Sequence, residues 1–223
     1  MLIIPHADMS NRGSLNRTAR AFRNHGAHVE VMDCPPKDLD LPKNLAKLDG
    51  VNVIFFSGGS PTALVNALQG TQFLERIREL HQAGATICGT SEGATVLSKI
   101  MLAGDGNHKV PKGKDPETFG VIEVGNVDLA DGFGFMPEAI IDPHFVVRKR
   151  MNRLLSAMQD RPDLLGLGID ENTAIDVDLN NGTFEVLGAR SVIVVKPLYK
   201  RGETPRFEVM QLRKGHTYEY RSE

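Results

Sequence analysis

Short apolar runs alternate with longer amphipathic stretches along the first part of the chain. The runs at residues 2–5, 29–32, 51–56 and 85–88 predict strands. The third run is nearly all apolar, as a strand covered on both faces must be. The stretch at residues 14–25 places its apolar side chains on one helical face. Strands that alternate with helices favour a parallel sheet with right-handed crossovers.

A helical stretch at residues 62–82 is expected to break at Gly70. Apolar runs at residues 139–142 and 164–170 predict two more core strands, and after about residue 173 the pattern changes. Beyond them the strands become short, and Asn181-Gly182 is typical of a hairpin turn. The pattern therefore predicts an α/β fold with a doubly wound, mainly parallel sheet and antiparallel C-terminal strands. We expect a single domain over residues 1–223, with a polar excursion at residues 107–117.

Composition narrows the class of protein. Lys and Arg total 26 against 28 Asp and Glu, so the formal net charge is −2, and 41% of the residues are hydrophobic. This excludes a disordered chain and argues against broad electrostatic binding of nucleic acid. Cys34 and Cys88 are the only cysteines, which leaves neither a disulfide framework nor a cysteine-rich zinc site. No run approaches the ~18 apolar residues of a membrane span, and we expect a cytoplasmic protein without a metal or organic cofactor.

The strongest chemical signal is the pattern G-x-S-x-G at residues 89–93. It comes directly after the apolar run at residues 85–88 and before a stretch that we predict to be helical over residues 94–101. A tight turn from strand to helix would place the Ser91 hydroxyl above the sheet, and the flanking glycines would remove side chains that collide. The pattern therefore predicts a nucleophilic Ser91. The alternative is a serine that only caps the helix.

A serine nucleophile also needs donors for the oxyanion that forms on the substrate. The N–H of Glu92 follows the nucleophile and lies at the start of the predicted helix, where free N–H groups and the positive end of the helix dipole meet. Gly59, in the loop after the strand at residues 51–56, is expected at the same sheet edge and supplies a second donor.

The base is sought among seven histidines. His144 follows the strand at residues 139–142, so it leaves the carboxyl end of a core strand, where open α/β sheets bind ligands. His6 follows the first strand and reaches toward the same edge, whereas His108 and His216 lie in the polar excursion and the tail. We therefore predict His144 as the general base.

The group that orients the base has two candidates. Glu171 follows the strand at residues 164–170, beside Asp170, and Asp105 lies in a glycine-flanked loop nearer Ser91. A rigid sheet edge holds a catalytic group better than a loop, which favours Glu171. The order Ser…His…acid differs from that of α/β-hydrolases and disfavours an ordinary esterase or lipase.

These motifs together resemble the cyanophycinase and aspartyl dipeptidase family of serine peptidases. Residues 89–94, Gly-Thr-Ser-Glu-Gly-Ala, resemble the family's G-T-S-A-G-A turn, with Glu92 in place of alanine. Residues 141–145, Ile-Asp-Pro-His-Phe, resemble its I-D-Q-H-F motif, and residues 168–175 resemble its G-I-D-E-x-T-A strand. The resemblance implies a fold like that of class I glutamine amidotransferases, which is flavodoxin-like, and a Ser91–His144–Glu171 peptidase that is often a homodimer.

The resemblance also implies a substrate class. Arg148, Arg150 and Arg153, which we expect on a helix after His144, match the arginine run of cyanophycinases, and their guanidinium groups suit carboxylate substrates. The alternative is a solvated helical face. We expect hydrolysis of β-Asp-Arg units or of peptides with an N-terminal Asp. The substrate-binding candidates that follow are Ser60, Asp142, Arg148, Arg150 and Arg153.

The chain departs from the family at several positions. Residues 58–61 read Gly-Gly-Ser-Pro where cyanophycinases have G-G-D-Q, and Pro143 replaces their glutamine. We also expect the chain to lack the strand that precedes the segment matching residues 2–5 in family members. Glu92 could pair with a substrate cation or be a first-turn acid of the helix. The alternatives to a peptidase are a catalytically impaired binding or regulatory relative and an esterase-type hydrolase of the same fold.

Overall fold

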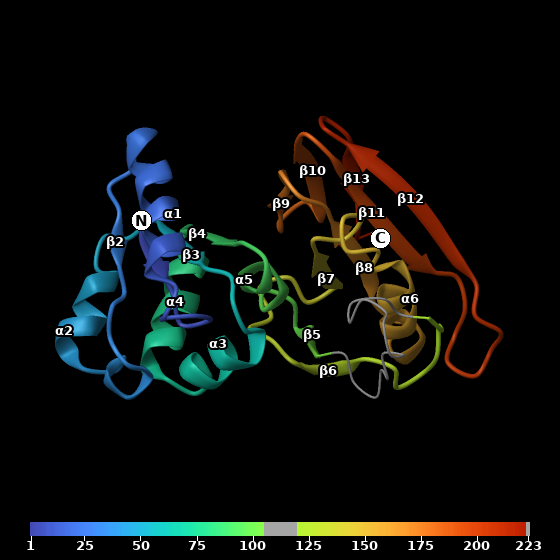
Figure 1. Cartoon of the computed structure of the whole chain (residues 1–223), viewed down its shortest axis with the longest axis horizontal. Coiled ribbons are helices and arrows are strands. Elements are labelled where there is room, and N and C mark those ends of the chain that lie inside the picture. The colour runs from blue at the N-terminus through green and yellow to red at the C-terminus, as the bar shows by residue number, and fades with distance from the viewer. Residues whose placement is uncertain (105–119, 222–223) are drawn as a thin grey trace. The chain divides into compact units, whose positions relative to one another are not determined.

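The computed structural model of the protein describes residues 1–104 and 120–221. The chain divides into two compact units, Met1–Val96 and Leu97–Glu223, each of which is considered by itself (Figure 1). The predicted excursion at residues 107–117, with Asp105 and His108, lies outside the described residues. The expectation of one domain stays a prediction.

The first unit contains a parallel sheet of four strands in the order β2-β1-β3-β4 (Figure 1). Its elements are β1 (Leu2–Ile4), α1 (Arg12–Asn24), β2 (Glu30–Val31), the 3-10 turn η1 (Pro36–Asp38), α2 (Pro42–Leu45), the 3-10 turn η2 (Ala46–Leu48), β3 (Val53–Phe56), α3 (Pro61–Leu68), α4 (Gln72–Gln82), β4 (Thr86–Gly89) and α5 (Glu92–Thr95). The parallel strands and connecting helices confirm the predicted alternation of β and α elements.

Hydrophobic burial explains this sheet. All three residues of β1 are fully buried, and Ile3 packs with Phe55 of β3 against Leu15 and Ala19 of α1. The helical stretch at residues 62–82 divides as predicted, because Gly70 adopts a φ of 77° between α3 and α4.

The second unit is built mainly from antiparallel strands. Its sheets have the orders β12-β11-β8-β7, β13-β10-β9 and β5-β6. Its elements are β5 (Ile100–Gly104), β6 (Asp128–Asp131), β7 (Ala139–Pro143), α6 (Met151–Asp160), β8 (Leu165–Ile169), β9 (Thr173–Asp178), β10 (Thr183–Gly188), β11 (Ser191–Pro197), β12 (Phe207–Arg213) and β13 (Thr217–Glu219). β9 and β10 pair across the Asn181-Gly182 turn, which confirms the predicted hairpin.

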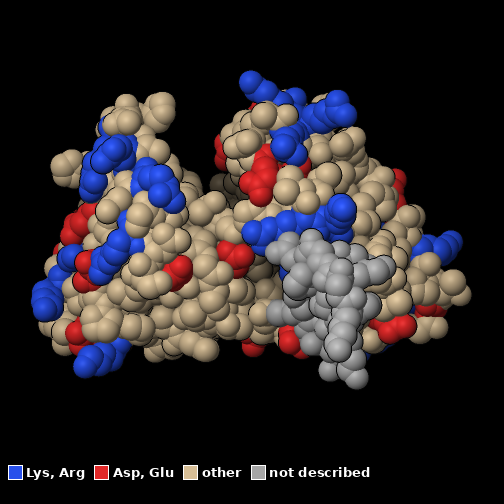
Figure 2. Space-filling model, in the orientation of Figure 1, with Lys and Arg blue, Asp and Glu red and all other residues tan. Residues whose placement is uncertain are grey.

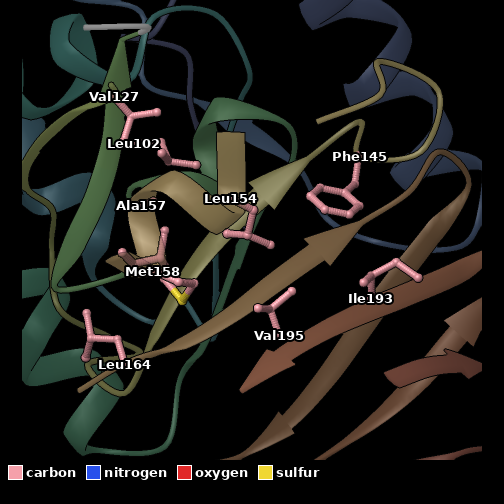
Figure 3. Packing of buried hydrophobic residues seen from close by; sticks show 10 residues of the cluster. Leu102, Val127, Phe145, Leu154, Ala157, Met158, Leu164, Ile193 and Val195 are labelled. Atoms are coloured by element: carbon pink, nitrogen blue, oxygen red, sulfur yellow. The ribbon is translucent and has the colours of Figure 1, made fainter. Parts of the chain in front are cut away.

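β7 and β8 are the one parallel pair of the second unit's described residues, and α6 connects them. Leu154 and Met158 of α6 are fully buried in a cluster that also contains Val195 of β11 and Phe145 (Figure 3). A Cβ on Gly168 of β8 would overlap the ring of Phe145. Gly168 therefore lets the residue that follows His144 pack directly on the sheet.

The helix predicted over residues 94–101 is wrong beyond its first turn. α5 ends at Thr95, and Ile100–Gly104 forms β5, which pairs antiparallel with β6. Met101 and Leu102 of β5 are almost fully buried. An apolar stretch of this length fits either a helix or a buried strand, and here pairing with β6 decides.

Arg148 and Arg150 also lie outside the helix on which we expected them. His144 and Lys149 have φ values of 56° and 54°, which no helix accommodates, so α6 begins only at Met151. Of the three arginines, only Arg153 is helical.

Charge is dispersed over both units. On the face drawn in Figure 2, basic and acidic side chains are interspersed over each unit. This distribution accords with the near balance of 26 basic and 28 acidic residues. Among the described residues, no helix has both the length and the apolar character needed to span a membrane.

Candidate active site

Ser91 lies in a strained turn in the first unit, between the end of β4 and the start of α5. Its backbone has φ 54° and ψ −127°, a conformation that a residue with a side chain rarely adopts and that costs of order 1–3 kcal/mol. The Ser91 side chain makes no capping hydrogen bond to α5, so the structure does not support the alternative that Ser91 only caps the helix. Strain of this kind concentrates at functional sites.

Glycines make this turn possible, as predicted. A Cβ on Gly89 would overlap the carbonyl of Gly93, and a Cβ on Gly93 would overlap the carbonyl of Phe56. A Cβ on Gly58 would lie 2.9 Å from the Cβ of Ser91. Glycine at residues 58, 89 and 93 therefore allows the end of β4, the Ser91 turn and the loop after β3 to pack closely together.

The Glu92 carboxylate folds back onto this turn. The Ser91 hydroxyl donates to Oε2 of Glu92 at 2.5 Å, and the N–H of Gly59 donates to the same oxygen at 3.0 Å. The structure thus brings together Ser91, Glu92 and Gly59, the predicted nucleophile and the two predicted oxyanion donors. From the sequence we expected the Glu92 side chain to interact with a substrate cation or with the helix dipole. Its hydrogen bonds with the Ser91 hydroxyl and the Gly59 N–H were not predicted.

Two other polar residues of the first unit have structural partners. The Ser60 hydroxyl caps α3 by accepting from the N–H of Ala63 at 3.2 Å. His6 is buried, with Nε2 3.0 Å from the carbonyl oxygen of Cys34, and burial lowers the pKa of its imidazole. A neutral imidazole packed against a backbone carbonyl is suited to a structural role.

The second unit holds the predicted base and its orienting acid together. His144 leaves β7 and Glu171 follows β8, and the parallel register pairs Pro143 with Ile169, which places both at one sheet edge. Nδ1 of His144 lies 2.6 Å from Oε1 of Glu171. Because a carboxylate only accepts, Nδ1 carries the hydrogen, and Nε2 of a neutral ring is left as the proton acceptor. This is the tautomer that a general base requires.

Asp170 holds the segment that follows His144. Its carboxylate, 3% exposed, accepts from the N–H of Val147 at 3.2 Å and from Arg190 at 3.3 Å. The adjacent acids Asp170 and Glu171 therefore both bind the segment after β7, one through its backbone and one through His144. Sequence reasoning did not assign this role to Asp170, although two successive acids at a strand end were the available signal.

Three of the predicted substrate-binding residues bind one another. Asp142 is fully buried and accepts from Nη1 of Arg150 at 3.3 Å and from Nε of Arg153 at 3.2 Å, and Nη2 of Arg153 closes a forked pair. Nη1 of Arg150 also donates to the carbonyl of Pro143 at 2.7 Å. Arg150 and Arg153 therefore do not form the solvated face that was the alternative to substrate binding; with Asp142 they form a largely buried cluster that binds the backbone immediately before His144.

Arg148 differs from the other two arginines. It is half-buried, and its N–H donates to the carbonyl of His144 at 3.0 Å. It therefore lies one turn from the base with part of its surface accessible. No group of three His, Cys, Asp or Glu residues suited to hold a metal ion occurs among residues 1–104 and 120–221.

We expect Asp142→Asn to lower the free energy of unfolding by about 3–5 kcal/mol, because it leaves two buried guanidinium groups without their counter-charge. The matched control is Asp163→Asn, which removes an exposed pair with Arg161 and should cost less than about 1 kcal/mol. Arg161 lowers the pKa of Asp163, so this carboxylate is ionised at neutral pH, where urea unfolding compares the variants. Equal losses would contradict the structural role of the buried cluster.

Comparison with known proteins identifies relatives by sequence. A family model of peptidase family S51 matches residues 1–186. A cyanophycinase of Trichormus variabilis is 36% identical over 198 residues, which cover 87% of this chain and 62% of that protein. A cyanophycinase of Geminocystis herdmanii is 35% identical over 196 residues, 86% of this chain and 68% of that protein. The chain thus spans just under two thirds of the Trichormus protein.

Solved structures agree in fold. A peptidase from an acI-B1 Actinobacterium superposes with a TM-score of 0.68 at 23% identity, covering 98% of this chain and 82% of that one. A putative peptidase E protein from Listeria monocytogenes superposes with a TM-score of 0.53 at 17% identity, covering 95% and 84%. At these identities the likeness is one of fold, and it confirms the predicted α/β class.

Proposed function

Since the chain belongs to peptidase family S51, we propose that it is a serine-type peptidase or isopeptidase that hydrolyses Asp-containing peptides through an acyl-enzyme on Ser91. The observation that carries the proposal is the hydrogen bond between His144 and Glu171, which sets the ring in the tautomer of a general base. The strained Ser91 turn supports the same assignment from the other unit.

In the proposed reaction, Nε2 of His144 takes the hydroxyl proton of Ser91 while Oγ bonds to the scissile carbonyl carbon. The carbonyl electron pair moves to oxygen, and the N–H groups of Gly59 and Glu92 stabilise the oxyanion. Collapse of the tetrahedral intermediate breaks the C–N bond, and the imidazolium returns its proton to the leaving amine. Water then hydrolyses the ester by the same proton transfers. Glu171 stabilises the imidazolium throughout.

Substrate recognition is proposed from chemistry and from the relatives' names. The resemblance to cyanophycinases and aspartyl dipeptidases suggests β-Asp-Arg bonds or Asp-X peptides as substrates, and relatives named cyanophycinase support the first of these classes. Arg148 is our candidate for a substrate carboxylate, since a guanidinium fork matches a carboxylate. We assign Asp142, Arg150 and Arg153 to positioning of His144, because their charged groups are buried against one another.

The experiment compares substrates on the purified protein. We expect hydrolysis of β-Asp-Arg or of an Asp-X dipeptide, and slower turnover of a simple aryl ester. Ester hydrolysis without peptide hydrolysis would favour an esterase of the same fold. Absence of all turnover would favour a non-catalytic binding relative.

We also propose a cytoplasmic homodimer. Light scattering coupled to size-exclusion chromatography tests the assembly, because a single 24.4 kDa chain and a pair are readily separated. A monomer at micromolar concentration would contradict it.

A further inference from the structure

The carboxylate of Glu92 accepts hydrogen bonds from the Ser91 hydroxyl and the Gly59 N–H, the two groups that must bind the substrate in the proposed reaction. One oxygen, Oε2, lies 2.5 Å from the Ser91 hydroxyl and 3.0 Å from the N–H of Gly59. All three residues belong to the first unit, and the Glu92 side chain is half-buried. Nothing in a serine mechanism requires an anion at this position.

Oε2 lies where the proposed reaction requires the carbonyl oxygen of the substrate. Attack needs the acyl group beside the serine oxygen at roughly 3–3.5 Å, with its oxygen about 2.7–3.1 Å from an oxyanion donor. The 3.0 Å separation between Gly59 N and Oε2 falls within that range. Two oxygens cannot occupy the same place, so Glu92 competes directly with the scissile carbonyl.

The backbone makes room for this contact. A Cβ on Gly58 would lie 3.4 Å from Oε2 of Glu92, in addition to its close approach to Ser91. The absence of a side chain at Gly58 therefore leaves the space in which the carboxylate sits. Glutamate at residue 92 and glycine at residue 58 together form one compact arrangement around the Ser91 hydroxyl.

Charge strengthens the competition. The tetrahedral intermediate places a negative charge on the acyl oxygen, and a carboxylate within hydrogen-bond distance of the same donor repels it. The carboxylate must therefore leave or be neutralised before Ser91 reacts. A cationic group on the substrate, an ammonium or a guanidinium near the scissile bond, supplies the counter-charge that draws it away.

We infer that Glu92 determines specificity: it covers the Ser91 hydroxyl and the Gly59 N–H until a cationic group of the substrate pairs with it. This inference rests on the proposed function, because it takes Ser91 as the nucleophile. Neutral substrates displace the carboxylate without compensation and react slowly. A different role, in which Glu92 is the base that activates Ser91, predicts the opposite effect of its removal.

The test measures second-order rates of labelling by two alkyl fluorophosphonates of equal length, one with a terminal guanidinium and one with a neutral isosteric end. We expect the unmodified protein to prefer the cationic probe by at least about tenfold, as loss of a charged hydrogen bond implies. In Glu92→Ala, labelling by the neutral probe should rise by at least about tenfold and the preference should vanish. Glu75→Ala, on the exposed face of α4, is the matched control and should change neither rate.

Glu92→Gln separates charge from occupancy. Glutamine can still contact Ser91 and Gly59 but carries no charge, so the cationic preference should vanish while labelling by the neutral probe rises less than in Glu92→Ala. Circular dichroism confirms that each variant is folded.

The outcomes are distinct. Labelling of Glu92→Ala by the neutral probe at the original rate or more slowly would overturn the inference and leave the proposed function intact. Faster labelling with an undiminished cationic preference would also overturn it. Failure of every folded protein to react at Ser91 would overturn the proposed function, and this inference with it.

Discussion

Ser91→Ala is expected to lower kcat for an Asp-containing peptide by about 10⁴-fold or more, as removal of the nucleophile does in other serine peptidases. The substitution removes only a hydroxyl from a residue whose backbone conformation is fixed by the glycines around it. Alanine tolerates this conformation about as well as serine, so the fold should persist. Steady-state kinetics on whichever of β-Asp-Arg and the Asp-X dipeptide the protein hydrolyses faster, together with circular dichroism, provides the measurement.

The matched control for Ser91→Ala is Ser14→Ala. Ser14 lies in the first turn of α1, where its backbone N–H donates to the side chain of Asn11, an interaction that alanine preserves. Its kcat should equal that of the unmodified protein. Retained turnover in Ser91→Ala would remove Ser91 from the mechanism and would direct attention to another nucleophile.

Glu171→Gln is expected to lower kcat by about 10³-fold or more, with little change in stability. The carboxylate accepts from Nδ1 of His144 at 2.6 Å, and it is 39% exposed. Glutamine offers an N–H in the same place, which favours the tautomer with hydrogen on Nε2. That tautomer cannot accept the proton of Ser91. The kinetics are to be measured at pH values where the unmodified protein is most active.

Two variants accompany Glu171→Gln. Glu185→Gln lies on β10 at an exposed position of the same unit and should leave kcat unchanged. Asp105→Asn tests the other candidate acid that the sequence left open and should also leave it nearly unchanged. A loss in Asp105→Asn as large as that in Glu171→Gln would show that the orienting acid had been misassigned.

Sequence patterns predicted the features that depend on local physics. Apolar runs located the strands, Gly70 marked the break between two helices, and Asn181-Gly182 marked the hairpin. The rule that parallel strands present their carboxyl ends at one edge predicts from sequence alone that His144 and Glu171 lie together, as the register of β7 and β8 shows.

Sequence patterns gave wrong predictions where the structure of a segment or the partner of a side chain depends on residues distant in the sequence. Ile100–Gly104 has the composition of either a buried strand or a buried helix, and only pairing with β6 settles the choice. Arg150 and Arg153 were predicted to bind a substrate carboxylate. In the structure their guanidinium groups form ion pairs with the buried Asp142, and this pairing cannot be recognised from the sequence. The Glu92 side chain folds back on Ser91 through a rotamer choice that local sequence does not determine.

The central claim, that Ser91 is the nucleophile of a peptidase, is tested most directly by covalent labelling followed by peptide mapping. The protein is incubated with a fluorophosphonate and digested, and the modified residue is identified by mass spectrometry. We predict one phosphonate per chain, on the peptide that contains Ser91, and none on Ser91→Ala. A folded protein that remains unlabelled, or that is labelled equally in Ser91→Ala, would contradict the claim.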